Sequence, residues 1–122
     1  MFEGTAEAAM QLYVALFPGS TIVSVEKYGP AGPGREGSIR HAVFELQGTR
    51  YRCIDSPVHH EFSFTPSISI CVDCDTPAQF EQAAAQLGAP GKVLMPAADY
   101  GFSKRFTWVQ DRFGVSWQLN LP

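Results

Sequence analysis

The chain has 122 residues, of which 45% are hydrophobic and 17% are charged, and its formal net charge is −3. This length is enough for one domain with a real core, and the composition argues against disorder. The slight acidity and the lack of basic runs exclude the electrostatic footprint of a nucleic-acid-binding protein, and no polybasic or amphipathic stretch indicates a membrane surface.

The hydrophobic runs and the cysteines indicate the cellular compartment of the protein. No apolar run approaches the length of a membrane span, and Met1 leads into Phe2-Glu3-Gly4 rather than into the charged and apolar regions of a signal peptide. The three cysteines cannot all pair within one chain, which is typical of a reducing compartment. We therefore expect a cytoplasmic protein with a small-molecule or protein partner.

The first half of the chain predicts one helix followed by strands. Thr5 is placed to cap a helix over 6–17, whose apolar residues recur every three or four positions, and Pro18-Gly19 ends it. Residues 29–37 are rich in glycine and predict a flexible connection between strands. Three stretches rich in β-branched and aromatic residues predict strands, namely 21–28, 38–46 and 49–55, the last two joined by a turn at Gln47-Gly48.

The second half repeats this order. Over 67–73, Ser67, Ser69 and Cys71 alternate with Ile68, Ile70 and Val72, which predicts a half-buried strand. Thr76-Pro77-Ala78-Gln79 has the pattern of a capping box with proline at the first helical position, and it predicts a second helix that Gly88 ends. Three further strands are expected, at 91–95, 103–110 and 115–121.

The last two strands form the clearest hairpin. Asp111-Arg112-Phe113-Gly114 separates them, and its glycine is suited to the positive φ that closes such a turn. After the turn, Val115, Trp117 and Leu119 alternate with Ser116, Gln118 and Asn120. This period of two gives the strand one apolar face to bury and one polar face to line a site.

Both halves therefore have the order strand, helix, strand, strand, strand, except that only Met1 to Glu3 precede the first helix cap, so its first strand is truncated or missing. This order resembles the PhnB-like branch of the vicinal oxygen chelate superfamily, which includes glyoxalase I, bleomycin-resistance proteins and extradiol dioxygenases. The helix Ala6-Glu7-Ala8-Ala9-Met10-Gln11-Leu12-Tyr13 with Leu16-Phe17-Pro18, and the closing Trp108-Val109-Gln110-Asp111-Arg112-Phe113-Gly114-Val115-Ser116-Trp117-Gln118, carry the resemblance.

The resemblance implies an α+β fold in which tandem βαβββ modules form a curved mixed sheet, with two helices on the convex side and a concave cleft. The whole chain, 1–122, is then a single domain with module one at 1–56, a linking loop at 57–66 and module two at 67–122. It also implies a homodimer. Some PhnB-like sequences carry a demethylubiquinone methyltransferase label, but this sequence shows no glycine-rich methyl-donor loop after a strand.

Metal-dependent members of the superfamily place one ligand on the first strand of each module and a carboxylate on the last strand of each. By this resemblance, one ligand would fall before Met1, and the other positions hold Ser67, Cys53 and Gln118. Neutral serine and glutamine are poor ligands for a hard divalent cation. We therefore predict that the family metal is absent and that no other cofactor is bound, with a divalent metal as the alternative.

Without a metal, the cleft offers mostly neutral hydrogen-bonding groups, which suit a polar small molecule. The residues expected to line it are Cys53, Asp55, His59, Ser67, Ser69, Ser116 and Gln118. No catalytic residue is predicted. One alternative is a metal-dependent enzyme of glyoxalase or dioxygenase type, with ligands from His59, His60, Glu61 or Asp55, and the other is a dimeric interaction module.

Three further motifs could have a functional or a structural role. In His59-His60-Glu61, adjacent residues point apart in an extended chain, which favours a loop-lining role over metal binding. Cys71-Val72-Asp73-Cys74 has redox or zinc spacing, but a zinc site needs a second pair, so packing cysteines are favoured. The stretch 98–102 has the glycine and aromatic residues of a mobile flap.

Overall fold

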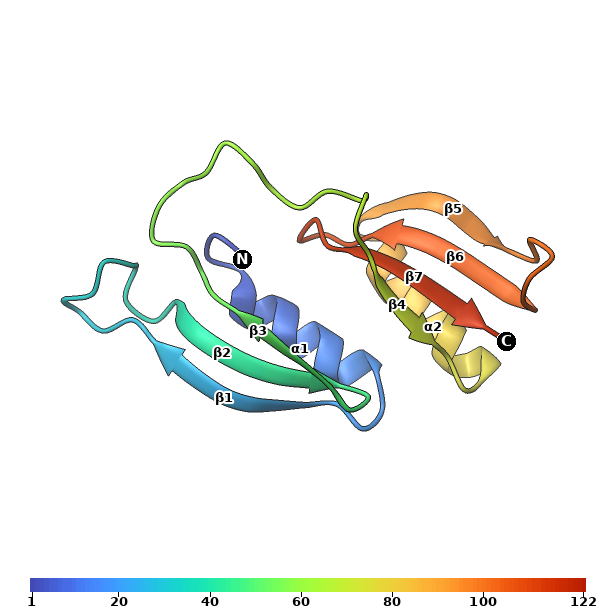
Figure 1. Ribbon diagram of the computed structural model, residues 1–122, viewed down its shortest axis with the longest axis horizontal. Helices are drawn as coiled ribbons and strands as arrows, with labels where there is room; N and C mark the ends of the chain where they lie inside the picture. The colour runs from blue at the N-terminus through green and yellow to red at the C-terminus, as the bar shows by residue number, and fades with distance from the viewer. The chain divides into compact units, whose positions relative to one another are not determined.

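The computed structural model describes residues 1–122 and divides them into two compact units, Met1–Glu61 (unit 1) and Phe62–Pro122 (unit 2). The boundary between the units falls inside the predicted linking loop. Each unit contains one helix and one sheet, so the chain is α+β as predicted (Figure 1). No helix has both the length and the apolar character needed to cross a membrane.

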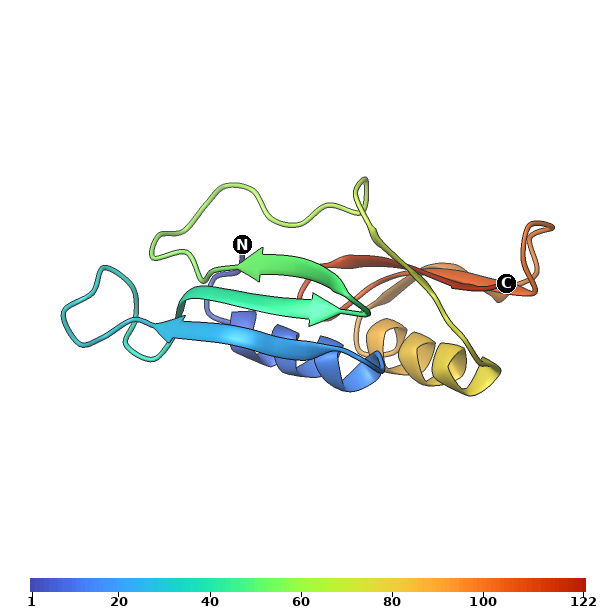
Figure 2. The same ribbon diagram turned by 60° about the horizontal axis from the view of Figure 1, so that its bottom comes forward.

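Unit 1 packs a helix against a sheet of three strands. Helix α1 (Ala6–Leu16) lies along one face of the antiparallel sheet β1-β2-β3, as Figure 2 shows. Tyr13 and Phe44 meet at this interface with their ring centroids 6.5 Å apart, and both side chains are buried. The amphipathic pattern of the helix therefore predicts the core correctly. The strands of unit 1 are β1 (Thr21–Lys27), β2 (Ile39–Leu46) and β3 (Thr49–Cys53).

The first strand of unit 1 is reduced to a single bridge. Phe2 pairs in parallel with Asp55. The backbone N–H of Phe2 donates to the Ile54 carbonyl at 2.8 Å, and the N–H of Ser56 donates to the Phe2 carbonyl at 2.7 Å. The truncated first strand is therefore confirmed.

Unit 2 contains the full version of the same arrangement. Its sheet has the order β4-β7-β6-β5, in which β4 and β7 are parallel and the other pairs are antiparallel. Helix α2 covers one face of this sheet, with Phe80, Leu87 and Trp117 fully buried. The tandem βαβββ order is confirmed. The elements of unit 2 are β4 (Ile70–Asp73), α2 (Pro77–Gly88), β5 (Lys92–Ala98), β6 (Arg105–Gln110) and β7 (Ser116–Leu121).

Local sequence signals place most turns and caps correctly. The hydroxyl of Thr76 accepts from the Gln79 backbone N–H at 3.2 Å, so the predicted N-cap of α2 is confirmed. The Gln79 side chain accepts from the N–H of Asp75, at 2.9 Å, rather than from that of Thr76, so the reciprocal bond of the capping box is displaced by one residue. Gln47 and Gly48 both have positive φ, at 49° and 85°, as a two-residue hairpin turn requires. Gly114 also has a positive φ, 93°, at the predicted closing turn.

Two local predictions are wrong in part. Thr5 occupies the N-cap position of α1 as predicted, but its side chain makes no capping bond, and the Asp55 carboxylate accepts the N–H of Ala6, the first residue of the helix, at 3.0 Å. The strand predicted from residue 67 begins only at Ile70, where its parallel pairing with Trp117 of β7 begins. Without a partner strand, Ile68 is 75% exposed rather than half-buried.

Candidate functional site

The sheet of unit 2 has one face covered by α2 and an opposite face, which we call the open face. On β7, Trp117 and Leu119 are fully buried, while Gln118 and Asn120 are only half-buried. Because side chains alternate along a strand, these two groups point to opposite faces of the sheet. The predicted alternation is confirmed, and the same argument applied to β6 puts Phe106, Trp108 and Gln110 on the open face, opposite the buried Thr107 and Val109.

A chain of hydrogen bonds runs across this face. The indole Nε1 of Trp108 donates to the Ser116 hydroxyl oxygen at 2.8 Å. The hydroxyl oxygens of Ser116 and Ser69 are 2.6 Å apart and share a second bond. Since Ser116 is only 2% exposed, the Trp108 ring is tied to a fixed and buried partner.

The next two rows along the face each contain one amide, Gln118 in the first and Asn120 in the second. Register places Gln118 between Cys71 on β4 and Trp108 on β6. The Cys71 thiol donates to the Gln118 side-chain oxygen at 3.8 Å, and the Asn120 amide nitrogen donates to Asp73 at 2.8 Å. The amide oxygen of Asn120 is buried and has no hydrogen-bond partner. The face therefore carries uncharged polar groups held in defined positions, including the amide nitrogen of Gln118.

An aromatic cluster borders the open face. Tyr100 and Phe102, from the segment between β5 and β6, stack with ring centroids 6.4 Å apart. Both rings meet Phe106 edge-on, at 6.0 Å from Tyr100 and 5.1 Å from Phe102. The predicted flap therefore meets Phe106 of the open face through two rings, Tyr100 and Phe102, and whether the flap moves stays a prediction.

The structure brings together only some of the residues that the sequence places in the cleft. Ser69, Ser116 and Gln118 lie on the open face within the network described above. Ser67 lies in the turn before β4, where its backbone N–H donates to the Thr65 hydroxyl at 3.5 Å. It is exposed and outside the strand.

Asp55 lies in unit 1, and its carboxylate is occupied by the backbone. One carboxylate oxygen accepts the Gly4 and Ala6 N–H groups at 2.8 Å and 3.0 Å, and the other accepts the Ile39 N–H at 2.9 Å. The side chain is 2% exposed. It joins the N-terminal stub, α1 and β2, which is a structural role, and a role in ligand binding stays a prediction.

Cys53 lies in the core of unit 1 rather than on an open sheet face. It is 6% exposed and is paired by register with the fully buried Ala42. Burial raises the pKa of the Cys53 thiol to about 11, so the thiol is protonated at neutral pH and is a poor nucleophile or metal ligand. Cys74 is also buried, with a pKa raised by burial to about 11, whereas Cys71 is exposed.

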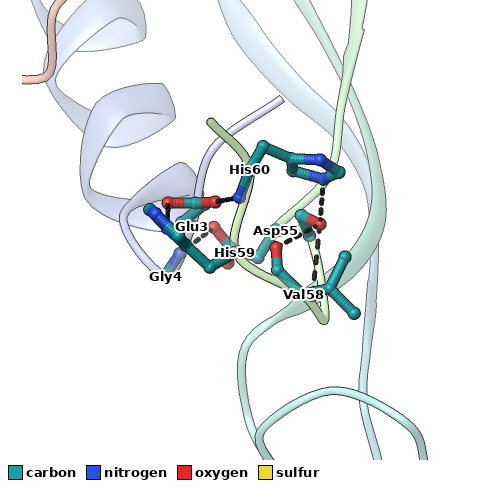
Figure 3. A network of polar contacts seen from close by, with 7 residues as sticks. Glu3, Gly4, Asp55, Val58, His59 and His60 are labelled. Carbon is teal, nitrogen blue, oxygen red and sulfur yellow. Dashed lines mark hydrogen bonds and ion pairs between the residues drawn. The ribbon is translucent and has the colours of Figure 1, made fainter. Parts of the chain in front are cut away.

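The two histidines of the linking loop have different partners (Figure 3). The Nδ1 atom of His59 is 3.2 Å from a Glu3 carboxylate oxygen, and the Nε2 atom of His60 is 2.8 Å from the Ser56 hydroxyl. The backbone N–H of His60 also donates to Glu3 at 2.8 Å, and this bond lowers the pKa of the Glu3 carboxyl. The His59 imidazole and the His60 backbone N–H therefore tie the loop to Glu3 of the N-terminal stub, whereas the His60 imidazole bonds Ser56. No three His, Cys, Asp or Glu side chains are grouped as metal ligands would be.

Each unit also has a shallow pocket of its own. The pocket of unit 1 has a volume of about 210 Å³ and includes Asp55 and Arg35, whereas the pocket of unit 2 has about 310 Å³ and includes Cys74 and Lys104. Of the residues predicted to line the cleft, only Asp55 borders either of these two pockets. The open face thus gathers more of the predicted site than these pockets do.

With this geometry established, comparison with known proteins places the chain. Residues 1–120 match the family described as 3-demethylubiquinone-9 3-methyltransferase. The chain belongs to this PhnB-like family. It is 48% identical to a PhnB protein from Bacillus cereus that carries the provisional name 3-demethylubiquinone-9 3-methyltransferase, and the match covers 100% of this chain and 95% of that one with a TM-score of 0.96.

A more distant PhnB-like fold is found in the protein PA1353 from Pseudomonas aeruginosa. That structure is 24% identical, the match covers 98% of this chain and 91% of the other, and the TM-score is 0.84. At this identity the comparison shows a shared fold. No curated protein matches the chain.

Two residues of the open face were missed as site residues by sequence reasoning. In the sequence, Trp108 stands out only within the closing motif and Asn120 only within an alternating pattern. The signal that finds both is the period of two shared by β6 and β7, because antiparallel neighbours pair Trp108 with Gln118 and Phe106 with Asn120.

Proposed function

We propose that this PhnB-like protein has the vicinal oxygen chelate fold and binds a polar small molecule on the open face of unit 2, without the metal of that superfamily. The observation that supports this most is the hydrogen-bonded chain of Trp108, Ser116 and Ser69. Side chains held in place by such bonds lose little conformational freedom when a ligand arrives. The adjacent amide nitrogen of Gln118 provides a donor that the protein itself does not use.

The residues at the superfamily's metal positions do not suit a divalent cation. Ser67 is an exposed hydroxyl in a turn, and Gln118 offers a neutral amide oxygen that already accepts from Cys71. Cys53 has a protonated thiol because its pKa is raised to about 11. Hard cations prefer carboxylate and water ligands, so we assign no step to a metal.

The methyl transfer in the family name would require a site for a methyl donor. Glycine-rich loops at helix N-termini bind nucleotide-like groups through free backbone N–H groups. At α1 the Gly4 and Ala6 N–H groups are taken by Asp55, and at α2 the first turn is closed by the Thr76 and Gln79 side chains. We therefore propose binding and assign no methyl-transfer step.

We also propose that the protein is a cytoplasmic homodimer. Strand β1 is one of the two edge strands of its sheet, and Val23 and Val25 on it are 46% and 44% exposed. Exposed apolar edge strands favour pairing between chains. Sedimentation at several concentrations tests this directly, with a dimer as the expected species and a monomer throughout as the contrary result.

Thermal-shift screening against polar metabolites tests ligand binding. A ligand stabilises the folded protein in proportion to its occupancy, so at least one compound is expected to raise Tm. Gln118→Leu should abolish that shift, whereas Gln82→Leu, at an exposed position of α2, should preserve it. Equal shifts in both variants would place the ligand elsewhere, and no shift with any compound would contradict binding.

Elemental content tests the metal part of the proposal separately. Protein purified without chelator is expected to contain no stoichiometric nickel, zinc, iron or manganese. A stoichiometric ion that is lost together with ligand binding on chelation would overturn the metal-free assignment.

A further inference from the structure

The rings around the open face narrow the class of ligand. Phe106 and Trp108 are two positions apart on β6 and therefore share the face. Tyr100 and Phe102 extend this aromatic surface, with side chains 39% and 66% exposed. Covering exposed rings is favourable in proportion to the apolar area removed from water. A ligand with an aromatic ring of its own gains most on this surface, because pairs of aromatic rings stabilise each other beyond the effect of burial alone.

The segment that carries two of these rings has defined contacts. The Tyr100 hydroxyl donates to the Pro96 carbonyl at 2.7 Å. The Gly101 N–H donates to the Asp99 carboxylate at 2.7 Å, and Gly101 has a φ of 93°, which a residue with a side chain rarely adopts. The turn therefore presents Tyr100 and Phe102 as a stacked pair.

The charge pattern of the face excludes a strongly ionic ligand. Between Cys71 and Met95, the row across the sheet contains only Gln118 and Trp108. Charged side chains are found at the ends of the face, where Asp73 already accepts from Asn120 and Lys92 lies at the edge opposite Gln110. A charged ligand centred on this row would lose hydration without gaining a counter-ion.

The polar groups of the same row favour a hydrogen-bond acceptor on the ligand. Gln118 uses its oxygen to accept from Cys71, which leaves its amide nitrogen to donate. Trp108, its neighbour on β6, has its own N–H bound to Ser116 and so offers the ring. The donor and the aromatic surface are thus on adjacent strands.

Building on the proposed function, we infer that the open face binds an uncharged, planar aromatic molecule that carries a carbonyl group. Its ring lies against the aromatic surface of Trp108, Phe106 and Phe102, and its carbonyl oxygen accepts from the Gln118 amide nitrogen. The ligand class therefore follows from the side chains of the open face.

Three probes of related shape test this inference by titration, followed through the Trp108 indole N–H signal. Naphthalene carboxamide is neutral and aromatic, naphthalene carboxylate is charged, and cyclohexane carboxamide is neutral but not aromatic. The first is expected to bind, and the other two are expected to bind about tenfold more weakly or less. Equal or tighter binding of either comparison compound at Trp108 would overturn the ligand class while leaving the proposed function intact.

A matched pair of variants tests the contribution of the rings. Phe102→Leu should weaken naphthalene carboxamide binding by roughly two- to tenfold. Val58→Ala is the control, because it also trims an exposed apolar side chain, with Val58 59% exposed against 66% for Phe102, and Val58 lies in unit 1. Equal effects of the two variants, or no response of Trp108 to the carboxamide, would overturn the inference. If polar compounds of other classes still shift the Trp108 indole signal, the proposed function stands. If no compound shifts that signal, both the proposed function and the ligand class are contradicted.

Discussion

The Nε1 atom of Trp108 and the hydroxyl oxygen of Ser116 are joined by a hydrogen bond of 2.8 Å that links β6 to β7 on the open face. Trp117, one residue further along β7, donates its own indole N–H to the buried carboxylate of Asp111 at 2.9 Å on the opposite side of the sheet. The two tryptophans of the chain therefore lie on opposite faces of one sheet, so the indole signal of each one reports on a different face.

Ser116→Ala is expected to lower stability and weaken ligand binding together. The change removes the acceptor of Trp108 and the partner of Ser69, and the loss of such bonds costs about 1 kcal/mol. Chemical denaturation measures the first effect and calorimetry the second. Ser63→Ala, at an exposed position before β4, is the control and should change neither. A variant with unchanged affinity would show that the indole orientation is irrelevant to binding.

Asp55→Asn should destabilise the protein by about 3 kcal/mol, because an amide cannot accept from all three backbone N–H groups and the charge that strengthens these bonds is lost. Denaturant titration measures this change. Glu36→Gln removes an exposed carboxylate and should stay within about 0.5 kcal/mol of the parent. Similar values for the two variants would contradict the structural role of Asp55.

Gly91→Ala should destabilise unit 2, whereas Gly29→Ala should have little effect. A Cβ atom at Gly91 would overlap the backbone carbonyl of Gln110, and overpacking of this kind costs about 1–3 kcal/mol. A Cβ atom at Gly29 meets nothing within 4 Å. Thermal unfolding of both variants measures the effect. An unchanged Tm for Gly91→Ala would show that the backbones at Gly91 and Gln110 do not approach each other so closely.

Cys71 should be the only thiol that reacts quickly in the native protein, because Cys53 and Cys74 are buried. Raising the pH from about 7 to about 9 should not activate the buried pair, since burial raises both pKa values to about 11. Their contribution to stability is complete below the ordinary value of 9.0 and is lost as the pH rises toward 11. Mass spectrometry after alkylation counts the labelled sites. Rapid native labelling of Cys53 or Cys74 would contradict their burial.

Patterns that depend on a few neighbouring residues predicted much of this fold. The period of two over 115–120 placed Trp117 in the core and Gln118 on the open face, and the Thr76 capping box predicted the start of α2. These signals are reliable because alternation along a strand and capping of a helix are fixed by local geometry. Comparison of the two halves also predicted that the first strand is truncated or missing, and the structure reduces it to the single bridge at Phe2.

Features that depend on distant pairing were not accessible in the same way. The Asp55 carboxylate accepts the Ala6 N–H at the start of α1, although the two residues are 49 positions apart in the chain. The late start of β4 at Ile70 follows from where β7 can pair with it. The register of Cys53 against Ala42 turns its side chain into the core of unit 1, and a contact with a ligand stays a prediction. A shift of one residue reverses the face of every side chain in a strand, so the face of such a residue is hard to predict without the partner strand.

The most direct test of the account is the response of the two indole N–H signals in a nitrogen–proton correlation spectrum when a ligand found by thermal shift is added. Trp108 lies on the open face and Trp117 in the core beneath α2, so the folded protein contains its own control. Binding on the open face predicts a saturable shift of the Trp108 indole signal and of the Gln118 side-chain amide, with Trp117 nearly unchanged. A ligand that raises Tm while leaving the Trp108 and Gln118 signals in place would contradict it.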